Sequence, residues 1–537
     1  MLSQPTPAGG PWRRSPWFWA ALLVMALFAG LIVRYHHPGT GWTSLISIGS
    51  KMEKHRVDAL VQTGPHIVEG SHGYDGQFYV QLALHPLLRS AELELAIDDP
   101  AYRARRIMMP WAAWLLGAGQ PAWIVQAYAL LNPLCWLLMG VLLWRWLPPV
   151  NADNFLRWAG VLGSHGVCMS VRHSLTDAPS LLLLAVAIYW WEKQRSKSAV
   201  AALAAAALTK ETAVLAGVLW AEPPLRGWRQ WGRLALIGGL IIAPLALWLG
   251  YVRWRFGANP GEEGLNNFTL PLAGLAGKWA ETLGEIRSEG WSRYNFPTLL
   301  TVAALSVQLA FFLCRWRWRE AWWRVGGIFA VLGLLVSQPV WEGHPGAATR
   351  VLLPMMLAFN LLVPRGRRWL PVLLAGNLSL VAGVLEFHPP RANLVYFHGE
   401  PALAGRQTFA VGEGWYLPEL KGWQTRRWAR QSAGLELHNH ADAPVTVQLK
   451  ARLSALSARQ LKLQLNGAPV WAAGLTEKAE WLESPPLVLQ PGVNRLEFVT
   501  DSPAEKPAQG DERELSFCVW ELAVHVRPAA ADLPARD

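Results

Sequence analysis

The sequence predicts a polytopic α-helical membrane protein that carries a β-sandwich at its C-terminal end. Of the 537 residues, 52% are hydrophobic and only 16% are charged, whereas globular domains average about 25% charged residues. Long apolar runs follow one another as far as residue 386 and stop before Pro389-Pro390. Beyond that point, short segments alternate apolar and polar residues, which is typical of β-strands. These observations separate a membrane part from a soluble part.

The first apolar run covers residues 17–33 and follows Trp12-Arg13-Arg14. A secretory signal peptide has a similar outline, but it ends in a cleavage site of small residues. No such site follows here, because the run continues into RYHH. We therefore expect a retained span, with residues 1–15 as a cytoplasmic tail.

Basic residues fill alternate gaps between the later apolar runs, for example at 193–197 and 315–319. The positive-inside rule places these gaps in the cytoplasm. The chain would then cross the membrane about eleven times and end on the outer side. The later runs are residues 121–146, 155–171, 176–192, 199–225, 232–252, 296–314, 324–340, 347–363 and 369–386.

The run at 199–225 has basic residues at both ends, yet it is too short for two spans of about 20 residues each. We therefore expect a hairpin of two short helices with Leu208-Thr209-Lys210-Glu211 at its tip. Broken helices at membrane depth are tolerated where they line a cavity, and ionisable residues there are functional candidates. The alternative is that Lys210 and Glu211 pair and cap a turn at the outer surface.

The expected domains are the tail 1–15, a transmembrane domain 16–388 with a long outer first loop 34–120, a β-domain 389–527 on the outer face, and a disordered tail 528–537. Alternating segments and turn residues such as Asn466-Gly467 and Pro491-Gly492 predict a β-sandwich or jelly roll. Its tryptophans Trp415, Trp423 and Trp428 could stack on a sugar, or they could lie in the core of a structural cap. The alternating segments are 434–440, 445–453, 461–467, 494–500 and 515–526.

The net charge of +11 could indicate nucleic-acid binding. The basic residues flank apolar runs, however, so membrane topology explains them better, and no nucleic acid is expected. The four cysteines have no spacing typical of a zinc site or a disulfide framework.

A lone carboxylate, Asp75, lies between two glycines in SHGYDGQFYV (71–80), in the first outer loop. Such an acid facing several cations suits transfer from a phosphate-linked donor. The acid can take a proton from an attacking hydroxyl while Arg and Lys hold the phosphate. Gly73 and Gly76 would let a substrate approach the backbone, and Tyr74, Phe78 and Tyr79 could pack on a sugar or an isoprenoid. Further outer candidates are Arg105, Arg106, Arg172, His173, Asp177, Lys210, Glu211, Glu342, His344 and Arg350.

Each candidate also has a structural interpretation: a turn former for Asp75, an interfacial anchor for Arg350, or an ion pair at a helix start for Arg172 and Asp177. Ordinary polar or solvated surface positions are the alternative for His173, His344, Asp98 and Asp99.

These motifs resemble those of the GT-C-type polytopic membrane glycosyltransferases, which use polyprenyl-phosphate-linked sugars. The matching features are YDGQFY (74–79) in the first outer loop, LTDAP (175–179) opening a short span, LTKET (208–212) at a helix break, and TRVLLP (349–354) opening a late span. The pairing of YDGQFY with YRARRIMMP (102–110) is most similar to one bacterial branch. The resemblance covers about residues 15–385.

The resemblance implies inverting transfer of a sugar from a polyprenyl-phosphate donor to a glycan, lipid or protein acceptor outside the bacterial cytoplasmic membrane. Asp75 would be the catalytic base by motif position. Some relatives need a divalent metal, but Asp75 has no adjacent acid, so we expect no required cofactor and assign no metal ligand. The alternative is a divalent metal for which Asp177 or Glu211 supplies a second carboxylate. The donor phosphate would be held by Lys210, Arg350, Arg172 and Arg106, and the substrates would contact Tyr74, Gln77, Tyr79, Asp177, Glu211 and His344.

Two other classes of function stay open at this stage. A transporter or lipid-handling protein could use the same cavity, with Lys210 and Glu211 as gating charges, although the sequence shows no internal repeat of the kind common in transporters. A non-catalytic assembly protein could bind a glycan through its β-domain and use the helices as an anchor.

Overall fold

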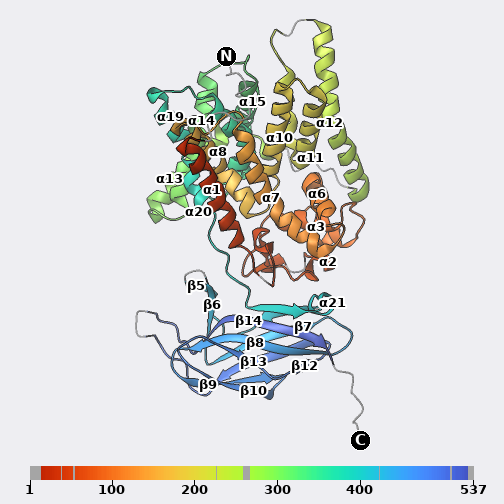
Figure 1. The fold of residues 1–537 in the computed structure, drawn as a ribbon, viewed down its shortest axis with the longest axis vertical. Coiled ribbons are helices and arrows are strands. Elements are labelled where there is room, and N and C mark those ends of the chain that lie inside the picture. The colour runs from red at the N-terminus through yellow and green to blue at the C-terminus, as the bar shows by residue number, and fades with distance from the viewer. Residues whose placement is uncertain are drawn as a thin grey trace. The chain divides into compact units, whose positions relative to one another are not determined.

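The computed structural model describes residues 14–37, 39–52, 55–224, 227–257, 266–421, 424–507 and 511–529. Contacts divide the chain into two compact units. The helical unit contains Met1–Arg34 and Tyr74–His388, and the β unit contains Tyr35–Gly73 and Pro389–Asp537. Figure 1 shows the helices concentrated in one unit and the large sheets in the other.

Half of the predicted apolar runs become single helices with similar bounds, and the others are divided between shorter helices. The helical unit contains α1 (Pro16–Val33), α3 (Gly76–Leu84), α4 (Glu92–Ala96), α5 (Pro100–Ala104), α6 (Met108–Leu116), α7 (Pro121–Leu143), α8 (Ala152–Leu162), α9 (His165–Arg172), α10 (Asp177–Glu192), α11 (Ser196–Thr209), η4 (Glu211–Trp220), α12 (Trp228–Phe256), α13 (Ala273–Glu289), α14 (Asn295–Cys314), α15 (Ala321–Leu335), α16 (Gln338–Trp341), α17 (Ala348–Val351), α18 (Leu353–Leu362), η6 (Arg367–Trp369), α19 (Leu370–Gly376) and α20 (Ser379–Leu385).

Within the described ranges, four helices are long and apolar enough to cross a membrane: α1, α7, α12 and α14. A bent pair, Arg367–Gly376 with Ser379–Leu385, could make a fifth span. Several predicted spans are instead divided; the run 155–171, for example, becomes α8 and α9. The expected number of about eleven crossings therefore stays a prediction. In α1 and α12 most of the apolar surface is uncovered, as expected for helices that face lipid.

The run at 199–225 is broken at the expected place. The helix α11 ends at Thr209, Lys210 has an extended backbone, and the 3-10 helix η4 begins at Glu211. Two short helical segments therefore meet at the predicted tip. The break places Lys210 and Glu211 between the ends of two helical segments, whereas in an uninterrupted helix they would lie along its side.

The β unit is a sandwich of two sheets. One sheet has the strand order β10-β9-β13-β7-β4. The other has the order β11-β8-β14-β6-β5, and it also includes β12 against β8 and β3 against β14. The strands are β3 (Val395–Gly399), β4 (Gln407–Val411), β5 (Glu419–Lys421), β6 (Gln424–Ala429), β7 (Ser432–Asn439), β8 (Val445–Ala455), β9 (Arg459–Leu465), β10 (Ala468–Leu475), β11 (Glu480–Glu483), β12 (Leu487–Leu489), β13 (Gly492–Thr500) and β14 (Phe517–Pro528).

All five predicted alternating segments are strands: β7, β8, β9, β13 and β14. The Asn466-Gly467 turn joins β9 to β10, and both residues have positive φ, as a two-residue hairpin of type I′ requires. The inward-facing residues of the two sheets, such as Leu463 and Phe498 on one and Leu449 and Val524 on the other, form a single apolar core.

The tryptophans of the β-domain favour the structural interpretation. Trp415 donates its indole hydrogen to the carbonyl of Gly434 and packs edge-on against Phe498 and Phe517. Trp428 is buried beside Leu515 and Cys518, and Trp423 lies outside the described residues, as does the predicted tail from residue 530 onward.

The domain boundary differs from the prediction in one respect. Residues 35–73, expected as part of the outer loop 34–120 of the membrane domain, pack with the β unit. Their short strands β1 (Ile48–Gly49) and β2 (Ile67–Val68) pair in parallel. Asn393 accepts a hydrogen bond from the Ile67 amide, and Arg427 forms an ion pair with Glu69. These polar contacts join residues 35–73 to the β unit. They connect residues far apart in the chain, so the local sequence does not predict them.

Candidate active site

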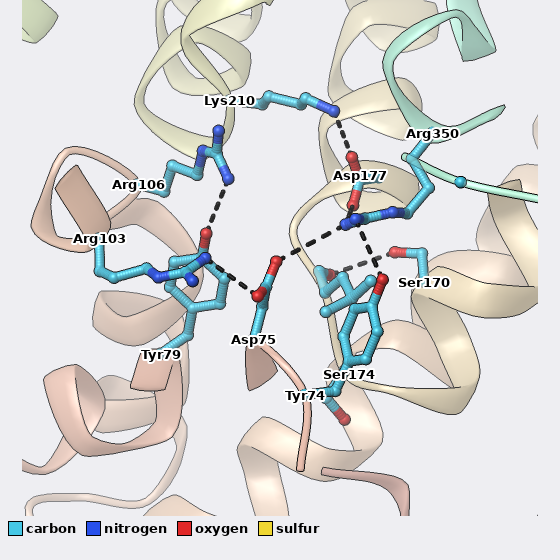
Figure 2. Close-up of polar contacts among 12 residues, drawn as sticks. Tyr74, Asp75, Tyr79, Arg103, Arg106, Ser170, Ser174, Asp177, Lys210 and Arg350 are labelled. Atoms are coloured by element: carbon cyan, nitrogen blue, oxygen red, sulfur yellow. Dashed lines mark hydrogen bonds and ion pairs between the residues drawn. The ribbon is translucent and has the colours of Figure 1, made fainter. Parts of the chain in front are cut away.

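Asp75 lies at the start of α3, after Gly73, whose positive φ suits only glycine well. Its two carboxylate oxygens face different helices. Oδ1 lies 3.1 Å from Nη1 of Arg103 in α5, and Oδ2 lies 3.9 Å from Nη1 of Arg350 in α17. Figure 2 shows both guanidinium groups pointing at the carboxylate. One of the expected cations, Arg350, therefore faces Asp75.

Lys210, which we expected to face Asp75 as well, pairs with a second carboxylate. Its ammonium group donates to Oδ1 of Asp177, at the start of α10. Oδ2 of Asp177 lies 3.4 Å from Nη1 of Arg350. Asp177 thus contacts two cations, Lys210 and Arg350. The structural interpretation offered above had paired it with Arg172 instead. Arg350 in turn bridges Asp75 and Asp177.

Glu211 faces a different pair of cations. Arg106 binds it in a bidentate geometry, with Nε and Nη2 at 2.9 and 2.8 Å from the two carboxylate oxygens. Nη2 of Arg105 lies 3.1 Å from Glu211, and Nη1 of Arg106 donates to the Tyr79 hydroxyl at 2.8 Å. Lys210 and Glu211 are therefore bound to separate partners, contrary to the simple turn-capping pair.

Tyr74 reaches the same centre from the loop before α3. Its hydroxyl accepts a hydrogen bond from Nη2 of Arg350 at 3.2 Å, and its ring stacks on His173 with centroids 4.6 Å apart. Burial raises the pKa of the Tyr74 hydroxyl, while the charge of Arg350 acts in the opposite direction. The phenol therefore stays neutral and serves as a hydrogen-bonding group.

Three other predicted site residues, Gln77, Arg172 and His344, lie outside the ion pairs described above. Gln77 is buried in α3, and Arg172 is buried at the end of α9. His344 contacts Thr298 at 3.4 Å, Glu285 at 3.7 Å and the ring of Tyr294, and none of these three residues belongs to the group around Asp75 and Arg350.

Sequence reasoning missed Arg103 and the role of Asp98. Asp98, expected to be solvated, forms two hydrogen bonds with Arg103 at 3.0 and 2.7 Å. Arg103 also lies over the ring of Phe78, 5.0 Å from its centroid. A spacing signal was available, because Asp98 and Arg103 flank Pro100, which begins α5 with Asp99 as its N-cap.

The ion pairs of this charge cluster leave positive charge in excess. Five cations, Arg103, Arg105, Arg106, Lys210 and Arg350, face four carboxylates, Asp75, Asp98, Asp177 and Glu211. These side chains lie in or next to α3, α5, α10, α17 and the break between α11 and η4. A site that gathers excess cations from separate elements is suited to an anionic group.

Asp177, Lys210 and Arg350 line one small pocket. Its lining combines these charged side chains with apolar walls. The apolar walls come from Leu181, Leu184, Ala213, Phe329, Val351, Leu353 and Pro354.

Within the described ranges, no group of three or more His, Cys, Asp or Glu side chains is arranged to hold a metal ion.

No family model and no curated protein matches this chain. Among solved structures, the arabinosyltransferase EmbB from Mycobacterium smegmatis aligns over 98% of this chain and 66% of its own, with 10% identity and a TM-score of 0.27. A carbohydrate-binding module, CBM36 in complex with calcium and xylotriose, aligns over 22% of this chain and 99% of its own, with 8% identity and a TM-score of 0.15. At these values neither likeness bears on the activity of this chain.

Proposed function

We propose that this protein is a membrane glycosyltransferase of the GT-C type. It takes a sugar from a polyprenyl-phosphate donor and transfers it to an acceptor on the outer side of the cytoplasmic membrane. The observation that carries the proposal is the position of Asp75, a partly exposed carboxylate between Arg103 and Arg350. Arg350 also lines a small pocket together with Asp177 and Lys210.

The three carboxylates at the centre of the cluster differ in how firmly they are held. The side chain of Asp177 is only 4% exposed and binds Lys210 and Arg350. Glu211 is held by Arg105 and by a bidentate pair with Arg106. Asp75 is exposed to the same extent as Glu211, 26%, but has only one close contact, at 3.1 Å, and one at 3.9 Å. Of the three carboxylates, Asp75 is therefore the one held by the fewest close contacts.

In the proposed reaction, the Asp75 carboxylate accepts the proton of an acceptor hydroxyl as its oxygen attacks the anomeric carbon. The bond between that carbon and the phosphate oxygen breaks, and the lipid phosphate leaves with the electron pair. Attack from the face opposite the leaving group inverts the anomeric centre. Lys210 and Arg350 stabilise the charge that develops on the phosphate.

Binding of a donor phosphate requires a change within the cluster, because both cations contact Asp177 before the donor arrives. A phosphate carries more acceptor oxygens than a carboxylate and can bridge Lys210 and Arg350 while Asp177 keeps part of its contacts. Asp177 thus prevents two buried cations from standing unpaired when the pocket is empty.

The test is Asp75→Asn, assayed with a radiolabelled polyprenyl-phosphate sugar and with separate measurement of donor binding. Loss of a general base lowers turnover by about 10²–10⁴-fold, so we expect that loss with donor binding retained. Asp98→Asn is the matched control, because Asp98 also contacts Arg103 but not Arg350 in the recorded ion pairs. Its activity should fall far less.

Full activity of Asp75→Asn would remove Asp75 from the role of base. A wild-type protein that binds the lipid phosphate without transferring sugar would instead support a lipid-handling function.

A further inference from the structure

A second polar group adjoins the site and is not used in the proposed reaction. Glu386 directly follows α20 and lies between two histidines. Its Oε1 is 3.2 Å from Nε2 of His165, and its Oε2 is 3.7 Å from Nε2 of His173. One carboxylate thus contacts both ends of α9, since His165 begins that helix and His173 caps it.

From Glu386 a first arm leads to the residue before Arg350. The other ring nitrogen of His165, Nδ1, lies 2.9 Å from the Thr349 hydroxyl. Thr349 also donates to the carbonyl oxygen of Gly346 at 2.9 Å. His165 is fully buried and Thr349 nearly so. This arm therefore fixes the short helix α17, which carries Arg350.

A second arm leads to the guanidinium group itself. His173 stacks on Tyr74 with an angle of 27° between the rings, and the Tyr74 hydroxyl accepts from Nη2 of Arg350 at 3.2 Å. The guanidinium also lies 5.5 Å from the centroid of the Tyr74 ring. Figure 2 shows Tyr74 directed at Arg350 from the side opposite Asp177.

The two arms close a ring that runs from Glu386 through His165 and Thr349 to Arg350, and back through Tyr74 and His173. An arginine side chain has many rotamers and loses that freedom when it is fixed. A ring that holds both its backbone and its guanidinium removes that freedom before a ligand binds.

We propose that Glu386 is a positioning residue that acts through this ring and holds Arg350 ready for an anionic group. The inference rests on the proposed function for the identity of that anion, a polyprenyl phosphate. Glu386 contacts His165 and His173, and Asp75 is not among its ion-pair partners in the described residues. Its effect should therefore appear in binding of the donor and should depend on the presence of Arg350.

The experiment compares Glu386→Gln, Glu386→Asp, Arg350→Ala and the double variant Glu386→Gln with Arg350→Ala. We expect Glu386→Gln to raise the donor KM by about tenfold, the size of a typical coupling between residues in one network. The acceptor KM should stay unchanged and kcat should change little. Glu386→Asp keeps the charge and should recover part of the affinity.

In the double variant, Glu386→Gln should add almost nothing to the effect of Arg350→Ala, because the guanidinium that the ring positions is gone. The matched control is Glu192→Gln, at the far end of α10. Glu192 is a partly buried acid that contacts Arg145 and Trp146 and lies outside the ring. It should leave donor KM unchanged.

Hydrogen exchange provides a readout that does not need the reaction. In Glu386→Gln, the amides of Ala348–Val351 should exchange faster than in the wild type, whereas those of α7 should not change. This result would support the ring even if the wild type neither transfers a sugar nor binds a polyprenyl monophosphate in micelles, which would reject the proposed function alone.

Unchanged exchange in α17 would overturn the inference. So would an unchanged donor KM in Glu386→Gln, or full additivity in the double variant, when the wild type is active. An equal rise of both KM values, with a loss of thermal stability that Glu386→Asp does not relieve, would show a structural role only.

Discussion

The two units of this protein bury different kinds of side chain. In the helical unit, charged groups such as Asp177, Lys210 and Arg324 are almost completely buried. In the β unit, the main core between the two sheets is apolar, and most ion pairs are partly exposed, as for Lys450 with Glu483. Burial of apolar surface explains the stability of the β unit, whereas the helical unit keeps charges that cost free energy to desolvate.

The charge cluster sets the helical unit apart. Such a cluster contributes little to stability compared with an apolar core of the same volume. The proposed function accounts for it, because that proposal gives Asp75, Lys210 and Arg350 chemical roles. We therefore expect removal of a buried charge to destabilise mainly the helical unit, and removal of apolar volume to destabilise mainly the β unit.

The largest effect is expected for Asp177→Asn in the helical unit. The change leaves the buried Lys210 without its carboxylate and close to the cation Arg350. Loss of one partner of a buried ion pair costs about 3–5 kcal/mol, measurable as the free energy of unfolding in detergent. The double variant Asp177→Asn with Lys210→Met should cost less than the sum of the two single changes. Additive costs would contradict a coupled pair.

A smaller effect is expected for Leu463→Ala in the β unit. Leu463 is fully buried between the sheets, so removal of its side chain should cost about 3 kcal/mol through lost burial and a cavity. Hydrogen exchange should rise in β9 and β13 and stay constant in α10. Lys462→Ala, on the exposed face of the same strand, is the control and should change stability by less than about 0.5 kcal/mol. Faster exchange in both units would contradict separate cores.

Acid pH should also destabilise the β unit. Burial, and then the neighbouring His66, His398 and His36, lower the pKa of His37 from 6.5 to about 4. Between these pH values the unfolded chain binds a proton that the folded unit excludes, so stability falls as pH falls from 6.5 to 4. Because His37 is partly exposed, we expect a loss on the order of 1 kcal/mol.

Hydrogen exchange of β3 at pH 6.5 and at pH 4, after correction for the intrinsic rate, measures this loss. His37→Gln should reduce the pH dependence, whereas His440→Gln should not, since His440 is exposed and contacts Thr408. An identical pH dependence in His37→Gln and the wild type would assign the effect to another group.

The smallest effect is expected for Lys450→Ala. The side chains of Lys450 and Glu483 are 42% and 53% exposed, and their charged atoms are 3.0 Å apart. An exposed pair contributes between zero and about 1 kcal/mol, and salt screens it. Unfolding curves of Lys450→Ala and the wild type should nearly coincide in 0.5 M salt. A cost similar to that of Asp177→Asn would erase the contrast between the two units.

Much of this arrangement could be predicted from local patterns. Apolar runs gave the helices, because a long apolar segment has to bury its surface or face lipid. Alternation gave the strands β7, β8, β9, β13 and β14, since side chains of a strand point alternately to the core and to solvent. Strands such as β6, which reads QTRRWA, were missed because their burial does not alternate.

Short motifs marked several residues of the charge cluster, but they did not mark the partners that only the fold brings to those residues. The break at Lys210 followed from a run too short for two spans, and the resemblance marked Asp75 and Arg350. Their partners needed the tertiary structure. Arg103 lies in a run of arginines that share one pattern, and Glu386 follows an ordinary apolar helix.

The sequence by itself determined the separation into apolar helices and alternating strands, the helix break at Lys210, and the lone acid of YDGQFY, because all of these are local properties of composition and spacing. Only the tertiary structure decided that Asp177 rather than Asp75 pairs with Lys210, that residues 35–73 belong to the β unit, and that Glu386 connects to Arg350 along two arms. The physical reason is that an ion pair depends on a few ångströms of separation between side chains. For residues far apart in the chain, packing of the helices sets that separation, and the spacing along the sequence does not.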